Sequence, residues 1–344
     1  FLSSKFLHVK DLFSFLSEVG IAFLMFTLGL ELSLDYLKKV KTVAIWGALI
    51  QILLVIILGI FIFPLFGFDF YASLFMGAAF SLSSTAIVFK ILSEKGELDT
   101  LPGEIMLGWL LVQDLAVLPM VAILPTMAGS SASFGVFALS ILKGVLILAL
   151  VLILGKNLVP KFIGWVADFG SRELLLIAVV SLCLLTAILT ASLGLSMALG
   201  AFLAGLIVSK TSENHAVFSE VRPLRDLFSI IFFVSLGMFL NPYFLVSHLP
   251  LILSLSLLVI LVKFLVIIIL VLYLGYHIKT AILVSMGLVQ VGEFAFVLSR
   301  IGLTQKLIDD NVYSLILSVA LLTILVTPWL IALAPKFYFG LQKM

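Results

Sequence analysis

Long apolar runs alternate with short polar connections along almost the whole chain. Most runs are about 20 residues long, which is the length that an α-helix needs to cross the hydrocarbon core of a bilayer. Their residues do not alternate between apolar and polar types, as they would in the strands of a membrane barrel. The pattern predicts an all-α polytopic membrane protein with eleven spans, near residues 12–30, 40–63, 70–92, 103–127, 133–157, 172–191, 195–210, 224–240, 247–274, 278–299 and 311–334.

The composition agrees with a membrane protein. Hydrophobic residues make up 63% of the 344 positions and charged residues 11%, which leaves too little polar surface for a soluble domain of this length. The net charge of +2 is dispersed between the apolar runs, so we expect no nucleic-acid partner. The single cysteine, Cys183, excludes an intramolecular disulfide and a cysteine-based metal site. We expect no cofactor.

Lysine and arginine gather in every second connection, which predicts the orientation of the chain. Connections rich in these residues stay on the cytoplasmic side of a membrane. The basic residues that follow the odd-numbered runs are Lys38, Lys39, Lys41, Lys90, Lys95, Lys156, Lys161, Arg172, Lys210, Arg222, Arg225, Lys279, Lys336 and Lys343. The connection with Arg300 and Lys306 departs from this pattern. We therefore predict a multi-pass protein of the inner (plasma) membrane with a cytoplasmic C-terminus.

Three apolar runs carry a charged residue near the depth of the bilayer centre. Asp114 follows Gln113 near the middle of residues 105–128, Lys263 lies midway along 251–273, and Glu293 lies within 281–298. A charge at this depth costs about 2.5–3.5 kcal/mol on insertion scales, so such residues face a protein interior or a wet cavity and mark the paths of ions and protons. The pattern therefore indicates transport.

Two of the predicted spans contain residues that interrupt a helix. Hydroxyl residues gather at Ser81–Thr85, and glycines flank Gln290 in Gly287–Glu293. Non-helical backbone at membrane depth occurs only around a cavity, and a pair of broken spans in two halves of a chain is the best sequence indication of a transporter's binding site. The alternative is that serine and glycine only let the helices pack closely.

Asp114 is the predicted site of exchange. A dehydrated monovalent cation and a proton cannot both occupy its carboxylate, so their competition is the simplest basis for antiport. Gln113 can supply an amide oxygen but no second titratable charge. The same site is predicted to include Ser83, Ser84, Thr85 and Gln290, whose oxygens suit a hard cation. The alternative is a structural aspartate paired with a fixed cation.

The roles of the other two charged residues stay open at this stage. Lys263 is too far from either end of its span to reach the interface. It can bond Gln113, pair with Asp114 in one state, or lie at the dipole end of a broken helix. Glu293 can contact the ion directly, or it can neutralise a helix N-terminus or pair with a basic residue.

Six stretches of the chain, in order, resemble one family. They are Phe26–Leu32, Ser83–Ile87, Val112–Pro119, Gly194–Gly205, Phe232–Met238 and Gly292–Val297. On these the chain resembles the Kef-type potassium/proton antiporters of the monovalent cation:proton antiporter-2 family. The resemblance implies an inverted-repeat fold in which two broken helices cross, and a homodimer with an elevator-like motion. The Gln113–Asp114 pair matches the Kef type, which implies electroneutral exchange with a preference for K⁺.

The resemblance also defines what we expect to lie outside this sequence. Members of the family have thirteen helices, so residues 1–344 would form the transmembrane transport domain without two N-terminal helices. Many members continue into a cytoplasmic nucleotide-binding regulatory domain, for which this sequence has no glycine-rich fingerprint. We predict an electroneutral K⁺/H⁺ antiporter that works by alternating access. The alternatives are Na⁺/H⁺ exchange at the same site, or a channel-like or sensor protein on this scaffold.

Overall fold

The computed structural model describes residues 42–127, 155–193, 197–239 and 242–342, and of the remaining chain residues 16, 18–20, 22–23, 25–27, 29–30, 151 and 153. Within these residues every regular element is a helix, as the sequence predicts. The chain divides into two compact units, each assembled from distant segments. The first comprises Phe1–Leu34 and Ala138–Phe239, and the second comprises Asp35–Phe137 and Leu240–Met344.

The first unit contains a helical pair joined by a tight turn and packed against α10. The helix over residues 155–167 is followed by α8 (Arg172–Ser192), α9 (Met197–Val208) and α10 (Asn214–Phe239). Both α9 and α10 pack on α8. Helix α9 packs closely on the N-terminal helical residues only because residue 205 is glycine. A Cβ at Gly205 would collide with the carbonyl oxygen of Phe26.

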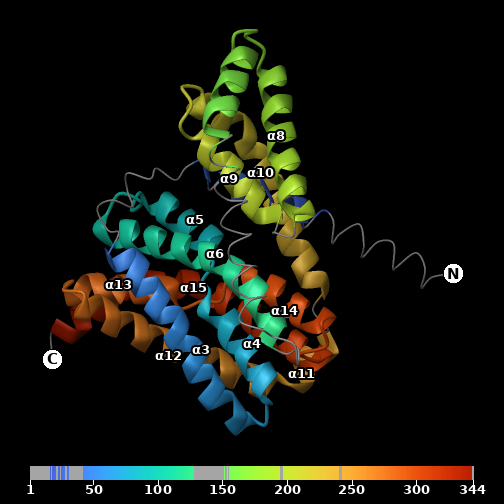
Figure 1. The fold of residues 1–344 in the computed structure, drawn as a ribbon. Coiled ribbons are helices and arrows are strands. Elements are labelled where there is room, and N and C mark those ends of the chain that lie inside the picture. Colours follow the sequence, from blue (N-terminus) through green and yellow to red (C-terminus); the bar gives the residue numbers. More distant parts are fainter. Residues whose placement is uncertain are drawn as a thin grey trace. The chain divides into compact units, whose positions relative to one another are not determined.

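The second unit contains all the residues that the sequence singles out as chemically active. Its elements are the π-helical turn η1 (Val43–Gly47), α3 (Ala48–Ile62), the 3-10 turn η2 (Phe63–Phe66), α4 (Phe70–Ser81), α5 (Thr85–Lys95), α6 (Leu101–Met127), α11 (Pro242–Ser247), α12 (Leu249–Tyr273), α13 (Ile278–Leu288), α14 (Phe294–Thr304) and α15 (Asp310–Gln342) (Figure 1). Helix α6 packs against α3, α5, α13 and α14, so it touches both of the spans that are broken.

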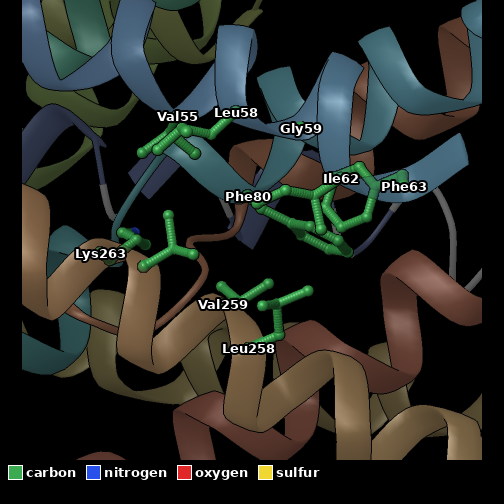
Figure 2. A pocket seen from close by; sticks show the side chains of 10 residues that line it. Val55, Leu58, Gly59, Ile62, Phe63, Phe80, Leu258, Val259 and Lys263 are labelled. Carbon is green, nitrogen blue, oxygen red and sulfur yellow. The ribbon is translucent and has the colours of Figure 1, made fainter. Parts of the chain in front are cut away.

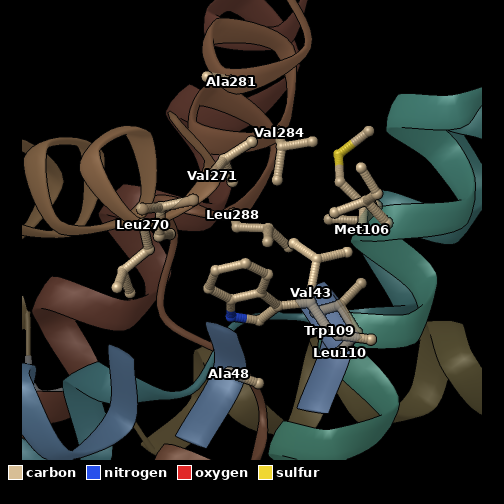
Figure 3. Packing of buried hydrophobic residues seen from close by; sticks show 14 of the residues in the cluster. Val43, Ala48, Met106, Trp109, Leu110, Leu270, Val271, Ala281, Val284 and Leu288 are labelled. Carbon is tan, nitrogen blue, oxygen red and sulfur yellow. The ribbon is translucent and has the colours of Figure 1, made fainter. Parts of the chain in front are cut away.

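A buried apolar cluster fixes α6 in this position. The indole ring of Trp109 is fully buried among side chains from η1, α3, α12 and α13, including Val43, Ala48 and Leu288 (Figure 3). A Cβ at Gly47 would overlap that ring, so the backbone of η1 lies directly on Trp109. A large aromatic side chain buried in this way orients the residues one turn further along α6, where Gln113 lies.

Both predicted interruptions are present. Helix α4 ends where Leu82 adopts an extended conformation, and α5 begins after Ser84, whose hydroxyl accepts a hydrogen bond from the Ile87 amide at 3.5 Å. Helix α13 ends before Val289, and α14 begins after Glu293. Each predicted span over 70–92 and 278–299 is therefore two short helices joined by extended or irregular backbone.

Hydropathy places the helices well but not all of their ends. Four described helical segments are long and apolar enough to cross a membrane by length and composition: Val43–Phe66, Arg172–Ser192, Leu249–Tyr273 and Asp310–Tyr338. Helix α10 begins at Asn214, ten residues before the predicted start at 224, and α15 continues past 334 to Gln342. A hydropathy pattern ends with the apolar residues, whereas the backbone hydrogen bonds of a helix continue through polar residues beyond them.

Some predictions concern residues outside the described part of the chain. These are most of the predicted span 133–157, much of the span 12–30, and parts of the Phe26–Leu32 and Gly194–Gly205 stretches. The last two residues, Lys343 and Met344, also lie outside it.

Candidate functional site

The two broken spans meet at their interruptions through their backbones. The Gly292 amide donates to the Leu82 carbonyl at 3.0 Å, and the Ser83 hydroxyl donates to the Leu288 carbonyl at 2.8 Å. A Cβ at Gly292 would collide with the carbonyl oxygen of Ser83. Glycine is therefore required at position 292 for the two interrupted segments to cross at this distance. The four helices α4, α5, α13 and α14 all end or begin near this crossing.

Lys263 joins the two interruptions from α12. Its ammonium group is fully buried and donates to the Leu82 carbonyl at 3.0 Å, the Gln290 carbonyl at 2.6 Å and the Ser83 hydroxyl at 2.9 Å. Leu82 and Gln290 follow the C-terminal ends of α4 and α13, where the helix dipole is negative. Among the three roles open from the sequence, Lys263 occupies the broken-helix ends, and these three hydrogen bonds go neither to Gln113 nor to Asp114.

The surroundings of the Lys263 stem are apolar. Side chains of α3, η2, α4 and α12, including Val55, Phe80 and Val259, line a cavity of about 20 Å³ beside it (Figure 2). That volume is about the space of one water molecule, and every lining residue other than Lys263 is apolar or a glycine. The three hydrogen bonds of the ammonium group at the crossing are therefore its main compensation for burial.

The side chain of Asp114, from within α6, reaches the start of α5. Its carboxylate accepts a hydrogen bond from the Thr85 hydroxyl at 2.9 Å, and the residue is half-buried. Thr85 is the first residue of α5, and a helix N-terminus has a positive dipole that favours an anion. Glu293 lies close enough to interact electrostatically with Asp114, and it precedes the first residue of α14. Both acids thus lie at helix N-termini, whereas the lysine lies at helix C-termini.

Gln113 faces away from Asp114, into the protein. It is fully buried, and its Oε1 accepts a hydrogen bond from the Ser83 amide at 2.8 Å. Its Nε2 donates to the Ser81 carbonyl at 3.3 Å and to the amide oxygen of Gln51 at 2.5 Å. One neutral amide therefore pairs with a donor inside the interruption, the Ser83 amide, and with an acceptor at the end of α4, the Ser81 carbonyl.

Gln290 supplies an oxygen atom that has no hydrogen-bond partner among the described residues. The side chain is fully buried, its Nε2 donates weakly to the Ser84 carbonyl at 3.4 Å, and its Oε1 is the atom left over. A buried acceptor without a partner costs about 1–3 kcal/mol. Because Ser84 adjoins Thr85, this oxygen lies on the same stretch of the crossing as the Asp114 contact.

The eight predicted site residues therefore all lie around the crossing, but they form two groups. Ser83, Gln113 and Lys263 hold the interruptions together, and Thr85, Asp114 and Glu293 form the acidic side. Gln290 and Ser84 connect the two groups through their hydrogen bond. Within the described residues no cluster of three or more His, Cys, Asp or Glu side chains is placed to hold a metal ion. The available oxygens come from hydroxyl, amide and carbonyl groups together with a carboxylate, which suits an alkali cation.

Three residues of this region were not predicted from the sequence. Gln51 and Trp109 hydrogen-bond each other beside Gln113 at 3.2 Å, and Thr323 of α15 accepts a bond from the Val291 amide at 3.1 Å. Gln51 had a signal that could have found it, because it is the one amide inside the apolar run 40–63. Trp109 and Thr323 had none, since both residue types are common in membrane helices.

Comparison with known structures identifies the fold. The sodium proton antiporter MjNhaP1 from Methanocaldococcus jannaschii aligns with 95% of this chain and 86% of its own, with a TM-score of 0.73 and 16% sequence identity. At this identity the likeness concerns the fold alone. It confirms the predicted class, an all-α polytopic membrane protein with the cation/proton antiporter fold.

Sequence comparison identifies the family. The model described as "Sodium/hydrogen exchanger, transmembrane" matches residues 2–333. K(+) efflux antiporter 4 of Arabidopsis thaliana is 39% identical over 93% of this chain and 55% of its own length. The putative cation/proton antiporter YbaL of Escherichia coli is 34% identical over 94% of this chain and 59% of its own length. The chain belongs to the sodium/hydrogen exchanger family, and the resemblance to Kef-type antiporters is confirmed.

The chain spans little more than half the length of these curated relatives. Their names are those of antiporters, which are transporters rather than enzymes.

Proposed function

We propose that this chain is the transport domain of an electroneutral K⁺/H⁺ antiporter in which K⁺ and H⁺ compete for Asp114. The observation that carries the proposal is the position of Asp114. Its half-buried carboxylate lies at the N-terminus of α5, against the Thr85 hydroxyl, where two broken helices cross. A carboxylate in such a place binds either a proton or a dehydrated cation, and each one displaces the other.

The neighbouring oxygens support cation binding at the carboxylate. Thr85 Oγ1 donates its proton to Asp114 and keeps a lone pair for an ion, and Gln290 Oε1 is buried without a partner among the described residues. The positive ends of α5 and α14 favour the charged carboxylate. When a proton replaces the cation, the net charge of the site does not change, because the carboxylate with its bound cation and the protonated carboxyl group are both neutral. Alternating access then returns the site across the membrane in the protonated form.

The charges around Asp114 support an exchange of one cation for one proton. Gln113 is neutral, and Lys263 is held by two carbonyls and a hydroxyl at the crossing. Provided that the charges of Lys263 and Glu293 stay constant during turnover, only Asp114 changes its occupant. The cycle then moves no net charge.

The choice of K⁺ rests on the relatives. Two of them, 39% and 38% identical to this chain, carry the name K(+) efflux antiporter. The family description and the name of the structural neighbour refer to sodium instead, so Na⁺ exchange at the same site is the second candidate. We further propose a homodimer in the inner (plasma) membrane, with a cytoplasmic C-terminus and a regulatory domain beyond this sequence.

Purified protein in liposomes with an internal pH-sensitive dye tests the function. Addition of K⁺, Na⁺, Li⁺ or Rb⁺ should dissipate an imposed pH gradient, with K⁺ effective at the lowest concentration and choline ineffective. Asp114→Asn should reduce the rate at least about 100-fold, because an amide cannot exchange a proton for a cation. The matched control is Asp69→Asn, which alters another helix-end carboxylate, the N-cap of α4. Substantial K⁺-dependent proton movement by Asp114→Asn would remove Asp114 from the mechanism.

Electroneutrality needs its own measurement. The membrane potential is set with valinomycin and a K⁺ gradient while Na⁺, which valinomycin does not carry, drives exchange, and currents are recorded on solid-supported membranes. Turnover should not vary with the potential, and no net current should appear. A current that follows the cation gradient would mean that a second proton or an unpaired charge moves with Asp114.

A further inference from the structure

A buried chain of amide groups runs from α3 through α6 to the interruption between α4 and α5. Gln51 of α3 is fully buried; its Nε2 donates to the Ser81 carbonyl at 2.9 Å, and its Oε1 accepts from Trp109 Nε1 at 3.2 Å. The same Oε1 accepts from the Nε2 of Gln113. Burying a glutamine side chain in an apolar helix is costly unless all its groups are paired. The hydrogen bonds that Gln51 makes must therefore compensate for its burial.

The direction of every bond in this chain follows from one residue. An indole N–H can donate but cannot accept. Trp109 therefore requires the oxygen of Gln51 to face it, which turns the Gln51 NH₂ group toward the Ser81 carbonyl. Gln113 must then present its own NH₂ group to Gln51 and its oxygen to the Ser83 amide. The reverse orientation of Gln113 would bring its NH₂ group against the Ser83 N–H, two donors in contact.

The hydrogen bond between Thr85 and Asp114 depends on this orientation of the Gln113 amide. Gln113 and Asp114 are consecutive on α6, and they bind Ser83 and Thr85, which are two residues apart at the start of α5. The hydrogen bond from the Ser83 amide to Gln113 thus fixes the position of residues 83–85 along α6. A shift of Ser83 displaces the Thr85 hydroxyl from the carboxylate, because the Ser83–Thr85 backbone is short and enters a helix directly.

We propose that Gln51, oriented by Trp109, is a positioning residue for exchange at Asp114 and acts through the amide of Gln113. The inference rests on the proposed function, since it concerns the same site. The hydrogen bonds of Gln51 go to Ser81, Trp109 and Gln113. Its role is to hold Gln113 in the one orientation that keeps the hydroxyl against the carboxylate.

The main test replaces Gln51 by methionine, which has a similar volume and makes no comparable hydrogen bonds. In liposomes, Gln51→Met should raise the K⁺ concentration for half-maximal exchange about tenfold, equivalent to about 1.4 kcal/mol. The rate at saturating K⁺ should stay within about twofold, because Asp114 itself is intact. The pH profile of exchange should shift as well, since the hydroxyl contact affects proton and cation binding differently.

The matched control is Val55→Ala, which removes buried volume one turn further along α3. It should lower thermal stability without changing the half-maximal K⁺ concentration or the pH profile. An independent readout is the melting temperature of detergent-solubilised protein with K⁺ against choline. Gln51→Met should lose most of the stabilisation by K⁺, whereas Val55→Ala should keep it.

A double-mutant cycle tests whether Gln51 acts through Gln113. If it does, Gln51→Met combined with Gln113→Met should bind K⁺ no more weakly than Gln113→Met alone. Trp109→Phe, which removes the N–H group and lets the Gln51 amide rotate, should shift the K⁺ dependence in the same direction by a smaller factor. This variant also decides the question if Gln51→Met does not fold.

The outcomes separate this inference from the proposed function. Absence of cation-dependent proton movement by the unaltered protein would overturn both. Normal exchange by the unaltered protein, together with unchanged K⁺ and pH dependence in Gln51→Met or, failing that variant, in Trp109→Phe, would overturn only the role of Gln51. Equal shifts in Val55→Ala, or fully independent effects of Gln51→Met and Gln113→Met, would also overturn it.

Discussion

The two interrupted spans have the same architecture but opposite chemistry. Between α4 and α5 the backbone is controlled by hydroxyl groups: Ser84 caps α5, Ser83 bonds across the crossing, and Thr85 reaches Asp114. Between α13 and α14 the residue that matters for geometry is Gly292, which has no side chain at all. The first interruption is shaped by hydroxyl groups, and the second is shaped by the absence of a side chain at Gly292, although it also carries Gln290 and Glu293.

The charged residues divide in another way, between the two helix ends that each interruption exposes. Lys263 lies where α4 and α13 end, and Asp114 and Glu293 lie where α5 and α14 begin. Breaking a helix inside a membrane exposes a negative and a positive end. The placement of one base and two acids compensates these ends on both spans. This compensation explains how a costly arrangement is stabilised, and under the proposed function Asp114 also binds the ion.

The largest expected effect comes from filling the space at the crossing. Gly292→Ala places a Cβ against the Ser83 carbonyl, and backbone atoms on both sides cannot move aside. Overpacking of this kind costs about 1–3 kcal/mol or more, and transport should be lost. Gly287→Ala is the matched control, because the three atoms nearest to its Cβ all belong to the flexible Met106 side chain. Melting temperature and exchange rate are measured on both; equal tolerance would show that the spans do not cross this closely.

A smaller but still large effect is expected at the base that joins the two spans. Lys263→Gln keeps hydrogen-bond donors but removes the charge at the ends of α4 and α13. Bonds from charged groups contribute about 1.5–3 kcal/mol, so the melting temperature should fall clearly while one proton still moves per cation. Flux ratio and melting temperature are measured on one preparation. Lost proton coupling at an unchanged melting temperature would make Lys263, rather than Asp114, the proton carrier.

The smallest expected effect distinguishes the hydroxyls of the first interruption from one another. Thr85→Val removes the donor to Asp114 and should raise the half-maximal K⁺ concentration about tenfold, since bonds to charged groups contribute about 1.5–3 kcal/mol. The pH profile should move to more alkaline values, because this bond stabilises the charged carboxylate. Ser84→Ala removes only a helix cap, about 1 kcal/mol of stability, and should leave the K⁺ dependence unchanged. Identical K⁺ dependence in the two variants would contradict the assignment of Thr85 to the site.

Much of the local structure was predictable because it depends on short stretches of chain. The helices over 172–191 and 247–274 follow from continuous apolar runs, and α8 and α12 coincide with them within two residues at each end. The interruptions at Ser81–Thr85 and Gly287–Glu293 follow from clustered hydroxyls and glycines. Helix ends in polar segments were predicted less well, as the early start of α10 at Asn214 shows.

The partners of the buried polar groups were less predictable. The position of Lys263 inside an apolar run shows that it needs partners, but three alternatives satisfied that need equally. The structure selects carbonyls that lie 181 and 27 residues away in sequence. Gln51 is a single amide in an apolar run, and the sequence does not predict its partners. The structure shows that they include Trp109 and Gln113.

The sequence by itself determined that this chain forms membrane helices, that two of them are interrupted, and that Asp114, Lys263 and Glu293 lie within apolar runs. These properties depend on hydropathy and on local backbone preference, which neighbouring residues set. The tertiary structure alone decided that Lys263 lies at helix C-termini, that Thr85 is the predicted hydroxyl residue whose side chain bonds the Asp114 carboxylate, and that Gln51 hydrogen-bonds Gln113. Hydrogen bonds are short and directional, so their partners depend on the packing of helices that are distant in sequence, such as the burial of Trp109 between α3 and α13.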